Sequence, residues 1–177
     1  MDTLKYDSPR PSNLTKQSVH RLAESIASQL GYKPGGDLKD VVAKLGGKIS
    51  VKNFWDTGLS DSGSMIVEAA GKFDIFVSTD TSLERDKFTI AHELGHYVLH
   101  FLWPNKNGTP VQRMAATRYG SDRVEWEANW FAAAFLMPEA EFKTKFKELG
   151  HDLGAVASYF GVSQAAAKVR AEGLGLP

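Results

Sequence analysis

The chain has 177 residues, of which 42% are hydrophobic and 24% charged, and this composition predicts one globular domain rather than a disordered segment. Its 21 basic and 21 acidic side chains balance, which argues against a nucleic-acid binder, and the lack of cysteine excludes disulfides, thiolate metal sites and a cysteine nucleophile. The sequence shows no signal peptide and no apolar run long enough for a membrane helix, so we expect a cytoplasmic protein without a membrane partner.

The N-terminal part of the chain predicts an arm followed by two helices. Residues 1–14 are polar and contain prolines, so we expect a flexible arm, and residues 15–177 are expected to form a single domain. Apolar residues at spacings of three and four begin near Ser12 and stop at Gly31, which predicts the first helix. The same spacing predicts a second, short helix over residues 38–45.

The pattern then changes to the alternation of a β-sheet. Residues 48–54 alternate strictly, as a half-buried strand does, and residues 64–69 and 73–78 are two more β-type runs. The short connection at residues 70–72 predicts a hairpin between the last two. We expect a small, mostly antiparallel sheet, with residues 64–69 as a candidate edge strand that a peptide could extend.

The remaining residues predict helices. One helix is expected over Thr89–Trp103 and is closed by Pro104. A long helix is expected over residues 121–137, followed by two shorter ones at 139–149 and 154–172. The order of helices, strands and helices predicts an α+β fold, in which the small sheet packs on helices and the chain ends in a helical tail.

The central motif is the H-E-x-x-H sequence that begins at His92 and ends at His96. Histidines four apart lie only about 40° apart around a helix, so both imidazoles can reach one metal ion. Imidazole suits Zn²⁺, which in catalytic sites takes three protein ligands and leaves one position for water. Glu93 points about 100° away from His92, where it can act on that water as the catalytic base. Gly95 is expected to clear space beside the second histidine.

A chance match on a buried helix is the alternative, and a downstream third ligand weighs against it. On a helical wheel, Glu125 falls amid apolar residues, whereas Glu127 falls in a narrow gap. A carboxylate in an apolar arc needs a counter-charge, and a zinc ion supplies one. We therefore predict Glu125 as the third ligand and Glu127 as a surface residue or second-shell partner. An ion pair of Glu125 with an arginine such as Arg123 is the competing interpretation.

Other polar residues are expected to support the site. Asn129 lies on the same side of its helix as Glu125, where it can hydrogen-bond a ligand. His100, two turns from His92, is interpreted as a second-shell donor or a satisfied core histidine, because a fourth protein ligand would close the catalytic position. Three candidates remain open for stabilising the oxyanion: Tyr119, Arg113 and His100. Two further histidines are expected at the surface: His20 and His151.

Two blocks of the chain, residues 87–100 around the H-E-x-x-H motif and residues 125–138, together resemble the ImmA/IrrE family of metallo-endopeptidases. The resemblance covers roughly residues 15–175 and is weakest in the first fifty and at residues 104–123. It implies a compact zincin fold and the cleavage of bacterial repressors with helix-turn-helix domains. On the matching positions it implies His92, His96 and Glu125 as zinc ligands and Glu93 as the catalytic residue. Bulky Trp126 and Trp130 depart from the family's pattern.

These features predict a zinc-dependent endopeptidase that cleaves a specific intracellular regulator, such as a helix-turn-helix repressor. The alternative is a non-catalytic, zinc-containing protein that sequesters a transcriptional regulator, and the intact Glu93 weighs against it. The tail at residues 156–170 looks like half of a helix-turn-helix, with Lys168 and Arg170 as its basic residues. Because the net charge is zero, we expect this tail to pack on the core without direct nucleic-acid contact. We expect a monomer.

Overall fold

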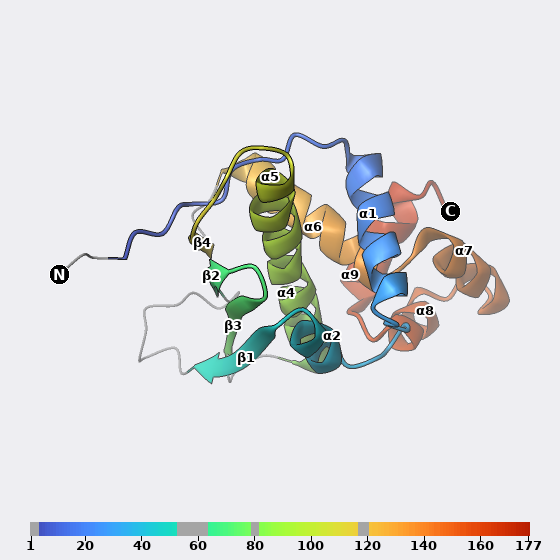
Figure 1. Ribbon diagram of the computed structural model, residues 1–177. Helices are drawn as coiled ribbons and strands as arrows, with labels where there is room; N and C mark the ends of the chain where they lie inside the picture. The colour runs from blue at the N-terminus through green and yellow to red at the C-terminus, as the bar shows by residue number, and fades with distance from the viewer. Residues whose placement is uncertain (1–3, 53–63, 79–81, 117–120) are drawn as a thin grey trace.

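Four strands form one mixed sheet in the computed structural model, which describes residues 4–52, 64–78, 82–116 and 121–177 (Figure 1). Their order is β1 (Gly47–Lys52), β3 (Lys72–Ser78), β2 (Ser64–Ala69) and β4 (Met114–Ala116). The pairing of β1 with β3 is parallel and the other two pairings are antiparallel. The sheet is therefore mostly antiparallel, and the α+β class predicted from the sequence is confirmed.

One expectation about the sheet needs correction. The hairpin between β2 and β3 is present, but β2 is not an edge strand, because β4 pairs with its other side. Among the described residues the edges are β1 and β4. The three-residue β4 was not foreseen, since so short a run carries no periodic signal. The first strand ends at Lys52, and the last two residues of the predicted strand, 53 and 54, lie outside the described ranges.

The central helix is longer than predicted at both ends. Helix α4 (Leu83–His96) begins after Ser82, whose side chain accepts a hydrogen bond from the Arg85 N–H. It continues into a π-helical segment, η1 (Tyr97–Leu102), and then into α5 (Trp103–Lys106). Pro104 does not end this helix, since α5 continues to Lys106.

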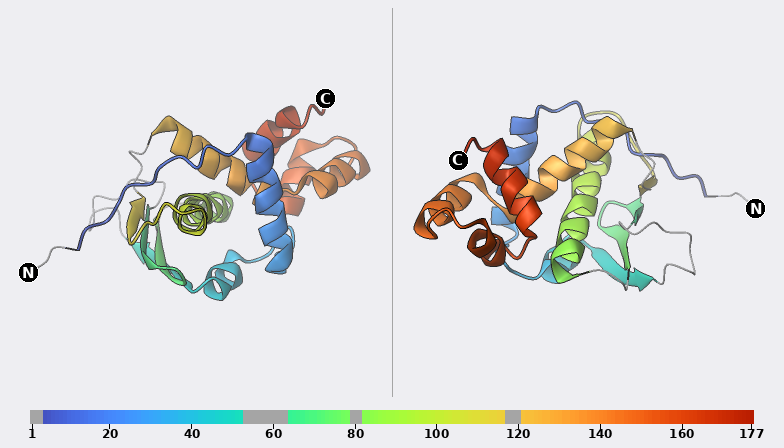
Figure 2. Two further views of the ribbon diagram at one scale, coloured as in Figure 1. Left: turned by 45° about the horizontal axis from the view of Figure 1, so that its top comes forward. Right: turned by 180° about the vertical axis from the view of Figure 1, so that it is seen from behind.

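Helices cover the side of α4 that faces away from the sheet (Figure 2, left). The predicted helices are confirmed in α1 (Lys16–Gln29), α2 (Leu38–Lys44) and α6 (Asp122–Leu136). Helix α6 crosses α4 closely at Gly95, where an added Cβ would lie only 3.0 Å from the Phe131 Cβ. The glycine thus makes room for α6 rather than for the second histidine, and it brings the carboxylates of α6 to the histidines of α4.

The C-terminal tail forms three helices, α7 (Glu139–Glu148), α8 (Leu153–Phe160) and α9 (Gln164–Gly173). The single helix predicted over residues 154–172 is wrong, because Gly161 adopts a left-handed conformation (φ 68°) and separates α8 from α9. The tail packs on the core as expected, since buried Arg170 donates from Nε to the Met137 carbonyl at 3.0 Å. Across the described ranges, no helix is both long and apolar enough to cross a membrane.

The described part of the N-terminal arm, residues 4–14, runs along the molecule from β4 to the start of α1 (Figure 1). Asp7 forms two backbone hydrogen bonds at β4: its N–H donates to the Arg113 carbonyl, and its carbonyl accepts from the Ala115 N–H. Farther along, Ser12 and Asn13 contact α6. The arm therefore connects the sheet with the helix that carries Glu125 and Glu127.

Candidate metal centre

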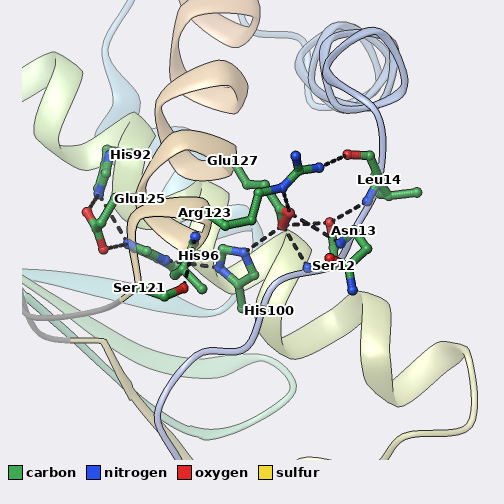
Figure 3. Close-up of polar contacts among 11 residues, drawn as sticks. Ser12, Asn13, Leu14, His92, His96, His100, Ser121, Arg123, Glu125 and Glu127 are labelled. Atoms are coloured by element: carbon green, nitrogen blue, oxygen red, sulfur yellow. Dashed lines mark hydrogen bonds and ion pairs between the residues drawn. The ribbon is translucent and has the colours of Figure 1, made fainter.

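Side chains from α4 and α6 converge on one point (Figure 3). The Nε2 atoms of His92 and His96 are 3.1 Å apart. The Glu125 carboxylate lies 3.0 Å from His92 Nε2 and 3.3 Å from His96 Nε2. One ligand atom from each of the three residues lies within 4.8 Å of the others. The structure thus brings together the three residues that the sequence predicts as metal ligands.

Asn129 sets the orientation of His92. Its Oδ1 lies 2.8 Å from His92 Nδ1. Because an amide oxygen only accepts hydrogen bonds, His92 Nδ1 carries the proton and Nε2 presents its lone pair to the centre. Asn129 therefore hydrogen-bonds one of the two motif histidines from the same side of α6 as Glu125.

A hydrogen-bonded chain sets the orientation of His96. Its Nδ1 lies 3.0 Å from His100 Nδ1, and His100 Nε2 lies 3.2 Å from a Glu127 carboxylate oxygen. A carboxylate accepts, so His100 donates from Nε2 and must accept at Nδ1 from the His96 Nδ1–H. This leaves the lone pair of His96 Nε2 facing the centre. His100 is thus a buried histidine satisfied by a ligand on one side and a carboxylate on the other.

Glu127 anchors this chain and is not a surface residue, since its side chain is fully buried. Its carboxylate accepts hydrogen bonds from the Ser12 N–H and hydroxyl, both at 2.7 Å, and from the Asn13 N–H at 3.2 Å. Burial alone would raise the pKa of Glu127, but hydrogen bonds from His100 and Ser12 lower it to about 2. Arg123 adds an ion pair at 3.2 Å, so this arginine pairs with Glu127 and not with Glu125.

The arrangement suits a cation at its centre. Two imidazole nitrogens and a carboxylate face one another, and a shared positive charge makes such a group favourable. Burial lowers the pKa of His92, but the hydrogen bond with Glu125 and the charges of Glu93 and Glu125 raise it above the usual value. Burial lowers the pKa of His96 to about 4, which keeps that imidazole neutral. Two imidazoles and one carboxylate are also a donor set that suits Zn²⁺.

Glu93 lies beside the three ligands without belonging to them. It is 4% exposed, and its Oε2 has no hydrogen-bond partner in the described part of the chain. Burial chiefly raises the pKa of Glu93 to about 8; the charge of Glu125 adds to this shift and that of His92 opposes it. Burying a carboxyl oxygen without a partner is costly, and groups with strongly shifted pKa values are enriched at functional sites.

Of the three oxyanion candidates, none lies free beside the centre among the described residues. Arg113 pairs with Glu68 at 3.2 Å, and His100 is held between His96 and Glu127. Tyr119 lies outside the described ranges. Sequence reasoning missed Ser12, because no local spacing relates it to a carboxylate 115 positions away.

Comparisons with known proteins give a matching family and a similar solved structure. Residues 55–172, more than half of the chain, match the family Peptidase_M78, described as the IrrE N-terminal-like domain. A solved structure of a Mycobacterium tuberculosis transcriptional regulator is similar, with a TM-score of 0.57 and 21% identity over 88% of this chain and 46% of that chain. At this identity the likeness shows the fold alone, and the chain spans less than half of that regulator. The comparison with curated proteins found no match.

Proposed function

We propose that this chain, which belongs to the Peptidase_M78 family of IrrE N-terminal-like domains, is a zinc-dependent endopeptidase. The observation that carries the proposal is the convergence of two histidine Nε2 atoms and a carboxylate next to the buried Glu93, whose Oε2 has no hydrogen-bond partner in the described part of the chain. Family membership implies a metallopeptidase. The choice of zinc rests on the chemistry of the three donors.

In this proposal His92, His96 and Glu125 hold the ion. Bound Zn²⁺ supplies a Lewis acid that polarises the scissile carbonyl and makes an attacking water acidic. Glu93 takes the proton from that water and delivers it to the leaving amine. A carboxyl with its pKa raised to about 8 by burial is suited to hold this proton between the two steps.

The substrate proposed is a specific intracellular regulator, such as a helix-turn-helix repressor, cut in a linker or a locally unfolding segment. Two observations support it: the resemblance to a family whose characterised members cleave repressors, and the fold shared with a transcriptional regulator. Both are analogies of fold and family. The physical requirement is that a peptide lies extended across the metal centre, which a packed core does not allow. Such a substrate places the protein in the cytoplasm.

The test combines the zinc-loaded chain with a purified helix-turn-helix repressor encoded beside it, and separately with casein, and identifies products by mass spectrometry. We expect one cut in the repressor, lost in Glu93→Gln. Broad digestion of casein with an intact repressor would contradict the substrate. Tight repressor binding without any cut would instead support a non-catalytic protein that sequesters a regulator, with Glu93 then unexplained.

A further inference from the structure

A groove of about 440 Å³ lies between α1, α4, α6 and α9, outside the metal centre. In Figure 2 (right), α9 lies beside the C-terminal part of α6. Most side chains that line the groove are apolar, and the largest belong to Trp126 and Trp130, the two bulky residues that depart from the family's pattern. Its volume falls within the range of pockets that bind ligands or peptide side chains.

The groove runs from the metal centre to the far end of α6. Trp126 directly follows Glu125, and Asn129 both lines the groove and hydrogen-bonds His92. Residues Trp130 and Met137 continue the same face of the helix. From Trp126 to Met137 the helix rises about 16 Å, at 1.5 Å per residue. An extended peptide covers this distance with about five residues.

Its walls are apolar and exposed. Trp126 is 54% exposed and Val169, on α9, is 68% exposed, so a partner would remove large apolar surfaces from water. The guanidinium of Arg123 lies 4.9 Å from the centre of the Trp130 ring, and Arg123 also pairs with Glu127. The groove wall and the hydrogen-bonded chain to His96 therefore share one anchor.

The groove also carries basic side chains. Lys16, His20 and Arg170 are among its lining residues, and no acidic side chain is among them in the described part of the chain. Arg170 is buried and lies 3.4 Å from Glu24, so its charge is partly met. The exposed Lys16 ammonium forms no ion pair within the described part of the chain. The Lys16 ammonium can therefore pair with an acidic side chain of a partner.

We propose that this groove binds the substrate polypeptide on one side of the scissile bond. It selects a segment with two or three bulky apolar side chains and an acidic residue that pairs with Lys16. The inference rests on the proposed function, because the groove adjoins the metal centre through Asn129 and a substrate that reaches the metal would extend into it.

Binding is tested apart from cleavage. Zinc-loaded full-length protein carrying Glu93→Gln is titrated with three fluorescent peptides, and anisotropy gives each Kd. The first peptide has two leucines, one phenylalanine and a distal aspartate; the second has lysine for aspartate, and the third serine for the apolar residues. We expect the first to bind most tightly. Val169→Asp and Ala166→Trp should weaken it about tenfold, the effect of losing one buried apolar side chain.

A second experiment reverses the charge of Lys16. Lys16→Glu should reverse the preference between the first two peptides, whereas the controls Lys33→Glu and Lys168→Asp, both outside the groove, should leave it unchanged. Zinc affinity should be the same in all these variants. Equal binding of the three peptides, or binding indifferent to Val169→Asp and Ala166→Trp, would overturn the inference. So would a concentration-dependent dimer lost in Val169→Asp, which would assign the groove to a second copy.

The two proposals fail differently. If the parent protein cuts no substrate but the peptides bind as expected, the endopeptidase proposal fails and the groove remains a peptide-binding site. If the parent cuts its substrate at the same kcat/KM with or without the groove substitutions, the groove inference alone is wrong.

Discussion

The Nδ1 atoms of His96 and His100 lie 3.0 Å apart, so the second histidine of the metal-binding motif is itself held by a buried histidine. Glu127 lies on the other side of His100. Its carboxylate also accepts hydrogen bonds from the backbone N–H groups of Ser12 and Asn13. Hydrogen bonding of this kind fixes the tautomer of a ligand and raises its basicity.

We therefore predict that His100→Phe lowers zinc affinity about 10- to 100-fold while the chain still folds. The measurement is competition with a chromophoric chelator. His151→Asn is the matched control, because His151 is exposed and its left-handed backbone (φ 64°) accepts asparagine. An unchanged zinc Kd in His100→Phe would show that the hydrogen-bonded chain does not act on the metal centre.

Glu125→Ala and Glu127→Ala should separate metal binding from stability. Glu125→Ala removes a ligand and should cause the larger loss of zinc affinity. Glu127→Ala should affect zinc less but cost about 1–3 kcal/mol of unfolding free energy for each buried donor left unpaired, such as His100 Nε2–H. Chelator competition and thermal unfolding of the metal-free proteins measure the two effects. The reverse ranking in zinc affinity would reject Glu125 as the ligand.

Glu93→Gln should retain both the fold and the zinc but lower the rate of peptide cleavage by about 10² to 10⁴, the usual contribution of a general acid–base residue. Glutamine has nearly the same shape, so burial at this position is preserved. Zinc content and circular dichroism serve as controls for the cleavage assay. Cleavage at the parent's rate would mean that another group moves the proton.

His20 should make the protein less stable as the pH falls from 7 to 5. Partial burial, and then the charges of Arg170 and Lys16, lower its pKa to about 4. His20 is half-buried, where the sequence predicts a surface residue. An unfolded histidine, with a pKa near 6.5, takes up a proton in this window while the folded one does not. Protons therefore favour unfolding, and the contribution of His20 to stability is present above pH 6.5 and lost as the pH falls towards 4.

The measurement is the thermal midpoint of the parent and of His20→Gln at pH 7 and pH 5. The decrease should be smaller in His20→Gln. The window lies above the usual pKa of carboxyl groups, so their titration contributes little to the difference. An equal decrease in the two proteins would show that His20 is protonated in the folded state.

Local spacing explains what could be predicted from the sequence. Two histidines four apart on a helix meet on one side whatever the rest of the fold does, and the helical wheel distinguished Glu125 from Glu127 by the same geometry. Helices α1, α2 and α6 were also predicted within a few residues, because their apolar stripes are regular.

The errors concern contacts that local spacing does not encode. Glu127 falls in a narrow gap on the wheel, yet its partners come from Ser12 and Asn13, more than a hundred positions away. Helix α4 begins six residues before the expected start, because the Ser82 side chain caps its first turn. The role of Gly95 depends on where α6 crosses, which only the packed structure shows.

The contact of Ser12 with Glu127 joins positions 115 apart in the chain, and it has a consequence for the order of assembly. During translation Ser12 leaves the ribosome long before Glu127. The nascent N-terminal arm therefore lacks the Glu127 carboxylate to which it later donates. The buried chain from Glu127 through His100 to His96 closes only once α6 has emerged and docked on α4. The metal centre therefore cannot be complete until α6 has been synthesised, and its closure joins segments separated by a long stretch of chain.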